Sequence, residues 1–192
     1  SLPTARMQVY FLDNEEFFQR KFVFRDNHEK FYADNGDRSI FFCKGALETV
    51  KKLGWAPDVV HCHGWMSGLA AAYVKTIYKE DPIFRNAKVV YSVYENCFTE
   101  SLGADFSTRA MLDGVKAGDV DAYKGADCNA MHMGAISYAD AVVLAENVDK
   151  TIVNHVKASG KPVLESANLT DFEPYAELYE EVLAGDLAQL EA

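Results

Sequence analysis

Two histidines flank a cysteine at His61, Cys62 and His63. Imidazole and thiol groups serve proteins as metal ligands, nucleophiles, general bases and hydrogen-bond donors, so three in a row suggest a site. The stretch 57–63 is typical of a short apolar strand that begins with a proline. Successive side chains of a strand point to opposite faces, so the two histidines share a face that Cys62 does not. Neither histidine can then act as a base for Cys62, which we interpret as a small core residue.

Three interpretations remain for the histidine pair. A zinc site would need a third ligand, which His132 or a carboxylate could supply, but no spacing selects one. In a structural interpretation, one ring is buried and hydrogen-bonded while the other lines a cleft. In a ligand-binding interpretation, Gly64 permits the close approach of a ligand, or an unusual turn into the next helix.

A second polar cluster precedes a predicted helix. Asp34, Asn35 and Arg38 lie at the end of a polar loop, and Asp37 is a natural cap for the helix. They are either capping and turn residues or a loop that hydrogen-bonds the hydroxyl groups of a sugar. His132 is flanked by methionines on a later predicted helix, where a structural role is the simpler interpretation.

Predicted strands and helices alternate along the chain. Such an alternation of apolar strands with helices predicts a doubly wound, mainly parallel α/β sheet of Rossmann-like type, covered on both faces. Ligands of these sheets bind at the carboxyl ends of the strands, where the histidine pair lies. A long polar connection, 95–127, should contain short helices. The predicted strands are 7–13, 57–63, 87–94, 141–146 and 161–166; the predicted helices are 37–53, 65–80, 129–140, 147–160 and 173–185.

Composition excludes several classes of protein. The net charge of −10 argues against a protein that binds the phosphate backbone of nucleic acids. The apolar stretches are too short to span a membrane. The four cysteines are widely spaced with no CxxC pair, so we expect no disulfide framework and a reducing, cytoplasmic location.

Four stretches of the chain carry a resemblance to a known family. They are VYFLDNEEFFQRK, YADNGDRSIFFCKGALETVKKLGWAPDVVHCHGWM, YVKTIYKEDPIFRNAKVVYSVYE and AISYADAVVLAE. In this order they resemble the bacterial glycogen and starch synthases that use ADP-glucose, and most of all the short Bacteroidetes-type versions. The last fifty residues match much less specifically.

The resemblance implies the GT-B architecture, in which two Rossmann-like domains enclose the active site. Residues 1–192 would then form a single, partial Rossmann-like domain from the N-terminal, acceptor-side half, with a docking helix and tail at 171–192. The family's N-terminal Lys-x-Gly-Gly-Leu loop and its C-terminal nucleotide-binding domain would lie outside this chain.

The resemblance also implies an activity and a set of residues. The activity is transfer of glucose, with retention, from ADP-glucose to an α-1,4-glucan, and it implies no cofactor and no metal. The His-x-His-Asp-Trp motif of the family falls on residues 61–65, which makes His63 the candidate catalytic contact with the transferred glucosyl unit. The further substrate-binding candidates are His61, Trp65, Asp34, Asn35 and Arg38.

This chain departs from the family pattern at several positions. Gly64 stands where the motif has aspartate, and Tyr94 stands where the family has a histidine. Three hypotheses follow. The chain is a glucosyltransferase domain that needs further sequence or a partner, or a catalytically silent glucan-binding or regulatory relative, or an unrelated α/β sugar-nucleotide or metal-binding enzyme. We also expect an incomplete sheet with an exposed edge that a second copy or a partner chain would cover.

Overall fold

The computed structural model describes residues 7–95, 97–165 and 171–190 of the chain. Its centre is a sheet of four parallel strands in the spatial order β1-β2-β3-β4. This sequential order places the right-handed connections between the strands on one side of the sheet. The strands are β1 (Val59–His63), β2 (Lys88–Val93), β3 (Ala141–Leu144) and β4 (Val163–Leu164).

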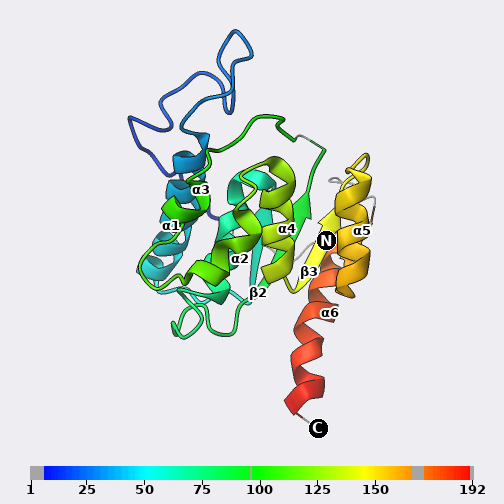
Figure 1. The fold of residues 1–192 in the computed structure, drawn as a ribbon. Coiled ribbons are helices and arrows are strands. Elements are labelled where there is room, and N and C mark those ends of the chain that lie inside the picture. Colours follow the sequence, from blue (N-terminus) through cyan, green and yellow to red (C-terminus); the bar gives the residue numbers. More distant parts are fainter. Residues whose placement is uncertain (1–6, 96, 166–170, 191–192) are drawn as a thin grey trace.

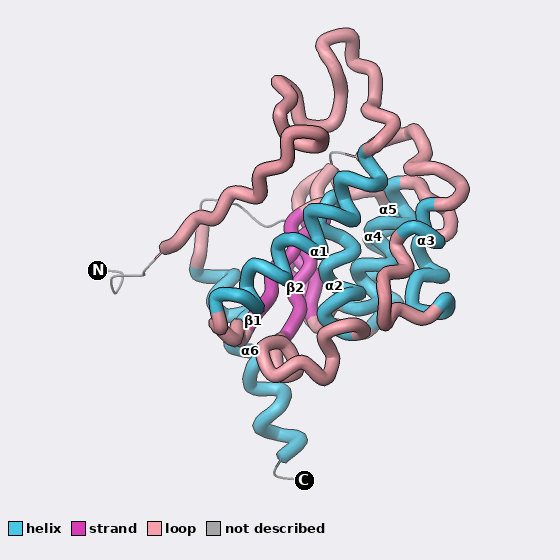
Figure 2. The backbone as a smooth tube through the Cα atoms, turned by 90° about the vertical axis from the view of Figure 1, so that its left-hand side faces the viewer, coloured by secondary structure: helices cyan, strands magenta, loops and turns pink. Residues whose placement is uncertain are grey.

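Helices cover both faces of this sheet (Figure 1). The helices α1, α2, α4 and α5 pack on one face, and α6 packs on the other (Figure 2). The helices are α1 (Asn35–Leu53), α2 (Gly68–Lys75), α3 (Phe106–Arg109), α4 (Cys128–Tyr138), α5 (Lys150–Ser159) and α6 (Glu173–Leu190), with the 3-10 helices η1 (Trp65–Ser67) and η2 (Ala117–Tyr123).

The predicted α/β architecture is therefore confirmed, and strand alternation explains its two layers. In β2, Tyr91 belongs to the core under the four helices, whereas its neighbour Val90 belongs to a smaller core under α6. Leu178 and Val182 of α6 are buried in that second core. The four described strands follow one sequential order, so no reversal of strand order falls among them.

The first helix of the structure follows the predicted apolar stripe. Cys43 and Leu47 are fully buried, and Gly54 ends α1 in the left-handed conformation with φ of 64°. The helix begins at Asn35, two residues earlier than expected, and Asp37 does not cap it. Instead, the Asp37 carboxylate pairs with Arg109, which packs α3 against the first turn.

Two other expectations require correction at the ends of elements. The predicted helix 65–80 is a 3-10 turn followed by a short α2, because the chain turns after Lys75. The predicted strand 161–166 is reduced to a two-residue β4, and the last residue of that stretch lies outside the described residues. Short helices do interrupt the long connection 95–127, as predicted.

The predicted strand 7–13 is wrong. The described part of this segment pairs with no strand, and the side chains of Met7 and Phe11 are 86% and 90% exposed. Its apolar alternation is typical of a strand, but a strand is stabilised only when another strand lies beside it. Figure 2 shows the segment as a loop that runs outside the sheet and its helices.

The expectation about cysteines is wrong for one pair. A disulfide joins Cys97 to Cys128, with 5.7 Å between their Cα atoms. Their separation of 31 residues gives no sign that the segment after β2 lies against the start of α4. Cys43 and Cys62 are free and buried. Cysteine spacing therefore no longer supports a cytoplasmic location. No helix in the described part of the chain is long and apolar enough to cross a bilayer.

Candidate functional site

The histidine pair lies on one face of β1, as strand alternation predicts. The rings of His61 and His63 stack with their centroids 4.0 Å apart. Cys62 lies on the opposite face in the main core, with 5% of its surface exposed. Burial raises the pKa of the Cys62 thiol. The residue is therefore an uncharged core side chain with no histidine beside it to activate it.

His61 is held by hydrogen bonds at both ring nitrogens. Its Nδ1 lies 2.5 Å from the hydroxyl of Tyr179, and its Nε2 lies 2.7 Å from the hydroxyl of Ser92. Burial, with a smaller contribution from the neighbouring His63, lowers the pKa of His61 to about 3. The ring is neutral near neutral pH, and its polar atoms already have partners within the protein.

His63 is the more exposed ring of the pair. Its Nδ1 lies 2.7 Å from the hydroxyl of Tyr94, and burial lowers its pKa below the ordinary value. Within the described ranges no other group hydrogen-bonds the ring. If Tyr94 donates to Nδ1, the neutral ring carries its proton on Nε2, where it can donate to a ligand. Both rings are thus hydrogen-bonded within the protein and both line one cavity, and His63 is the more exposed of the two. The structural interpretation, with one ring buried and the other in a cleft, therefore describes the pair only in part.

That cavity lies between the end of β1 and the first turns of α6. It has a volume of about 290 Å³ and one strongly aromatic wall. Apolar walls with a few polar groups are the usual composition of small-ligand sites. The lining residues are His61, His63, Phe172, Tyr175, Ala176 and Tyr179.

Gly64 makes the turn that follows the two histidines. Its backbone has φ of 71° and ψ of 173°, a region occupied almost only by glycine. Its N–H donates to the carbonyl of Ser92 at 2.9 Å, which keeps the turn against β2. An added Cβ would lie 3.5 Å from the Tyr94 ring, an ordinary contact, so backbone strain rather than lack of space requires glycine here.

Trp65 points into the core instead of the cavity. Only 2% of its surface is exposed, and its ring lies 4.8 Å from Phe24 and 4.7 Å from Phe98 between centroids. This contact holds the segment before α1 and the segment after β2 against the end of β1. Trp65 therefore positions the surroundings of the site and does not line the cavity of His63.

The polar groups of Asn35 and Arg38 bind backbone within the protein. The Asn35 amide donates to the carbonyl of Phe24 at 2.9 Å. Arg38 is 3% exposed and donates to the carbonyls of Phe17 at 2.9 Å and Val23 at 2.6 Å. Both residues thus hold the loop before α1 in place.

Asp34 forms an ion pair with Arg20 of the same loop. The guanidinium of Arg20 lowers the pKa of the Asp34 carboxyl group, so the pair is charged at neutral pH. The structure therefore separates the candidate residues into the histidine cavity and a loop anchor made of Asp34, Asn35 and Arg38. These contacts are not the capping bonds of the structural alternative, because no side chain caps the start of α1.

Sequence reasoning missed the hydroxyl groups that orient the histidines. Ser92, Tyr94 and Tyr179 supply these contacts from β2, the residue after it and α6. The signal for Ser92 and Tyr94 was their place at the carboxyl end of a strand, and Tyr94 also stands where the family has a histidine. No signal pointed to Tyr179, which lies 118 residues from its partner.

One group of three side chains in the described residues has the spacing of a metal site. It comprises Cys97, Cys128 and His132, whose ligand atoms all lie within 4.8 Å of one another. The two sulfur atoms form a disulfide and have no thiolate to offer a metal ion. In the described part of the chain, His61 and His63 have no third ligand beside them.

Comparison with known protein families shows to which family the chain belongs. The family model of the starch synthase catalytic domain matches residues 1–158. The chain belongs to this family. The resemblance seen in the four sequence stretches is therefore confirmed.

Curated members of the family include several bacterial glycogen synthases. The glycogen synthase of Chlorobium limicola is 41% identical over 95 residues, which are 49% of this chain and 19% of the relative. That of Chlorobaculum tepidum is 34% identical over 74% of this chain and 29% of the relative. That of Clostridium perfringens is 30% identical over 77% of this chain and 29% of the relative. The chain thus matches less than a third of the length of these relatives.

A solved structure shares the fold. The catalytic domain of starch synthase IV from Arabidopsis thaliana, bound to ADP and acarbose, superimposes with a TM-score of 0.58. The match covers 80% of this chain and 32% of the plant domain, at 18% sequence identity. The parallel sheet and its helices are therefore those of this glycosyltransferase fold.

Proposed function

We propose that this chain forms part of the acceptor-side domain of a glucosyltransferase of the glycogen synthase type. The reaction would transfer glucose, with retention, from ADP-glucose to an α-1,4-glucan. The family, the names of the bacterial relatives and the ADP and acarbose bound to the plant structure support this proposal. In it, His63 contacts the transferred glucosyl unit.

The observation that carries the proposal is the arrangement of His63 at the carboxyl end of β1. Tyr94 hydrogen-bonds its Nδ1, and the ring faces a cavity lined by aromatic side chains. A neutral ring can donate from Nε2 to a sugar hydroxyl without bringing a positive charge next to a developing oxocarbenium ion. A hydrogen-bond donor that the protein already fixes in position before the reaction stabilises the transition state more than a mobile donor does.

The other candidate residues support this contact in the proposal. The ring of His61 stacks on that of His63 and fixes its position. Trp65 packs on Phe24 and Phe98 and so holds the segments around the site. Asp34, Asn35 and Arg38 keep the loop before α1 in the shape that faces the acceptor. Residues 1–192 act as one Rossmann-like domain, with 171–192 as its docking helix and tail.

The proposal assigns the diphosphate of the donor to residues outside this cavity. No lysine or arginine is among the described residues that line it, and a diphosphate leaving group requires cationic donors. Catalysis would therefore need the remaining length that the relatives have.

A second copy or a partner chain covering the free edge of β1 is also part of the proposal, as is a cytoplasmic location, where nucleotide sugars are found.

A second candidate is a catalytically silent glucan-binding relative. The cavity favours it in one respect, because its aromatic wall suits a neutral sugar and not a charged nucleotide. The two candidates differ in the ligand that the chain binds.

Isothermal titration calorimetry with ADP-glucose and with maltoheptaose tests both candidates. We expect His63→Ala to weaken sugar binding about tenfold, the value of one lost hydrogen bond of about 1.4 kcal/mol. His28→Ala, at an exposed histidine before α1, is the matched control and should bind like the unmodified chain. Binding of maltoheptaose alone favours the silent relative. Binding that is unchanged in His63→Ala would contradict the site.

A further inference from the structure

The disulfide lies at the same edge of the sheet as the histidine cavity. Cys97 follows Tyr94 by three residues at the carboxyl end of β2, and Cys128 is the first residue of α4. Cys97 is exposed and lines a cavity of about 300 Å³ with Phe31, Trp65 and Phe98, whereas Cys128 is 2% exposed. Cys97 is therefore the more accessible of the two cysteines to a thiol in solution.

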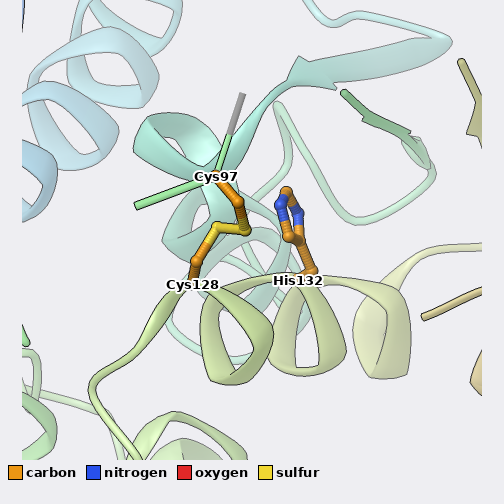
Figure 3. Close-up of side chains that lie close together, drawn as sticks. All are labelled: Cys97, Cys128 and His132. Carbon is orange, nitrogen blue, oxygen red and sulfur yellow. A yellow bond between two sulfur atoms is a disulfide. The ribbon is translucent and has the colours of Figure 1, made fainter. Parts of the chain in front are cut away.

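A buried histidine lies beside the disulfide (Figure 3). His132 follows Cys128 by four residues, which places both on one face of α4. One of its ring nitrogens lies within 4.8 Å of both sulfur atoms. The residue is 1% exposed, and its Nε2 has no hydrogen-bond partner among the described residues. A buried polar atom without a partner is costly and requires an explanation.

The contact of His132 Nδ1 shows which of the two ring nitrogens carries the proton. The hydroxyl of Tyr91 lies 2.8 Å from His132 Nδ1 in the core. We assign the tautomer in which Tyr91 donates to Nδ1, because the reverse would leave the tyrosine proton without an acceptor as well. Burial lowers the pKa of His132 to about 4, so the ring is neutral near neutral pH. The proton therefore lies on Nε2, which is a donor without an acceptor.

Thiol chemistry at Cys128 would provide that acceptor. A thiolate at this position lies at the N-terminus of an eleven-residue helix, where the helix dipole stabilises negative charge. A ring nitrogen of His132 lies within 4.8 Å of this sulfur, and release of the disulfide would let the thiolate approach the Nε2–H. The carboxylate of Asp127 opposes this effect, but it already accepts the N–H of Ala130.

We propose that the Cys97–Cys128 pair is a thiol–disulfide exchange site in which Cys97 is attacked and Cys128 is the leaving group. The thiolate of an external dithiol bonds to Cys97 Sγ, and the bond between the two cysteines breaks. Its electron pair passes to Cys128, whose thiolate accepts the hydrogen bond from His132. The second thiol of the reductant then displaces Cys97, so that the dithiol becomes a disulfide and the protein gains two electrons and two protons.

Exchange at this site would act on the histidine cavity next to it. The disulfide ties the segment after β2 to α4, and this segment carries Tyr94, which orients His63, and Phe98, which packs on Trp65. Opening the disulfide releases that tie. The proposal goes beyond glucosyl transfer and does not depend on it, because it rests on the disulfide, the exposure of Cys97 and the orphaned Nε2.

The unmodified protein provides the first test. The folded chain is incubated with reduced glutathione at about 1 mM, quenched in acid and mapped by mass spectrometry. We expect glutathione on Cys97, and after dithiothreitol two alkylated cysteines, Cys97 and Cys128, with Cys43 and Cys62 protected by burial. Glutathione on Cys128, or a disulfide that resists dithiothreitol until the protein unfolds, would overturn the proposal.

Two matched variants provide the second test. Cys97→Ser leaves Cys128 as a free thiol beside His132, and Cys128→Ser leaves Cys97 free. The ultraviolet absorbance of the thiolate, followed as the pH rises to about 10, reports the pKa of the freed cysteine in each variant. Cys43 and Cys62 stay protonated over this range, because burial raises the pKa of Cys43 to about 12 and that of Cys62 still further.

We expect the pKa of Cys128 to lie about one unit or more below that of Cys97. His132→Gln in the Cys97→Ser background should remove most of this difference. An equal or higher pKa at Cys128 would overturn its assignment as leaving group. If these variants do not fold, the mapping of the unmodified protein still decides.

Discussion

The ring of His61 and the hydroxyl of Tyr179 are joined by a hydrogen bond of 2.5 Å across 118 residues of sequence. This bond ties α6 to the face of β1 that carries His63. Tyr179 also lines the cavity in front of His63, so the position of α6 determines how wide that cavity is. The helix and the candidate site are therefore structurally linked.

Removing the Tyr179 hydroxyl should destabilise the protein. Tyr179→Phe leaves His61 Nδ1 without its partner while keeping the ring, so we expect the free energy of unfolding to fall by about 1 to 2 kcal/mol. Urea denaturation measures this change. Tyr175→Phe is the control, because no described group hydrogen-bonds that hydroxyl, and its effect should be within about 0.5 kcal/mol. Equal effects of the two variants would show that the hydrogen bond does not hold α6.

The protein should lose stability as the pH falls from about 7.5 to about 5. Burial lowers the pKa of His61 to about 3 and that of His132 to about 4, whereas each unfolded ring titrates near 6.5. Below about pH 6.5 the unfolded chain therefore binds more protons than the folded chain, and protonation favours unfolding.

The loss over this range should be on the order of 2 to 3 kcal/mol, with allowance for the partial exposure of His61. Denaturation curves at a series of pH values measure it. His61→Gln should reduce the slope, since one of the two rings no longer titrates. A free energy of unfolding that stays constant between these pH values would contradict the buried, neutral state of both rings.

Gly64 should not tolerate any side chain. Gly64→Ala forces an L-residue into a backbone conformation with φ of 71°, and we expect a loss of about 1 to 3 kcal/mol in the free energy of unfolding. Gly118→Ala is the control, because an added Cβ there meets no atom within 4 Å and the backbone has no positive φ. The aspartate of the family motif would meet the same strain at position 64. A stable Gly64→Asp variant would show that the turn can be rebuilt.

Arg38 should be required for the order of the loop before α1. Arg38→Met keeps much of the side-chain volume but leaves two backbone carbonyls without a donor, so we expect a loss of about 2 to 4 kcal/mol. Limited proteolysis should then cut within 14–32 faster than in the unmodified chain. Arg85→Met, at an exposed arginine, should change neither quantity. Unchanged proteolysis in Arg38→Met would remove the anchoring role.

Much of the fold could be predicted from local sequence patterns. Three of the strands, the helix of the Cys43 and Leu47 stripe and the helix that ends at Gly160 follow from apolar periodicity and glycine caps. The opposite orientations of Cys62 and the two histidines follow from strand alternation alone. These features depend only on residues that are close together along the chain, so the sequence is sufficient to predict them. The strand expected at 7–13 was wrong because a strand also needs another strand beside it, and a local pattern does not show that none of the described strands lies there.

The candidate site was predicted only in part. The sequence by itself determined that two histidines share one face at the carboxyl end of a strand, because side-chain alternation is a local property of the backbone. Only the tertiary structure decided that Tyr179 holds His61, that Tyr94 orients His63 and that Cys97 meets Cys128. It also decided that Asn35 and Arg38 bind backbone carbonyls. Each of these contacts joins segments that the packing of helices on the sheet brings together, and no local pattern records which distant groups will meet.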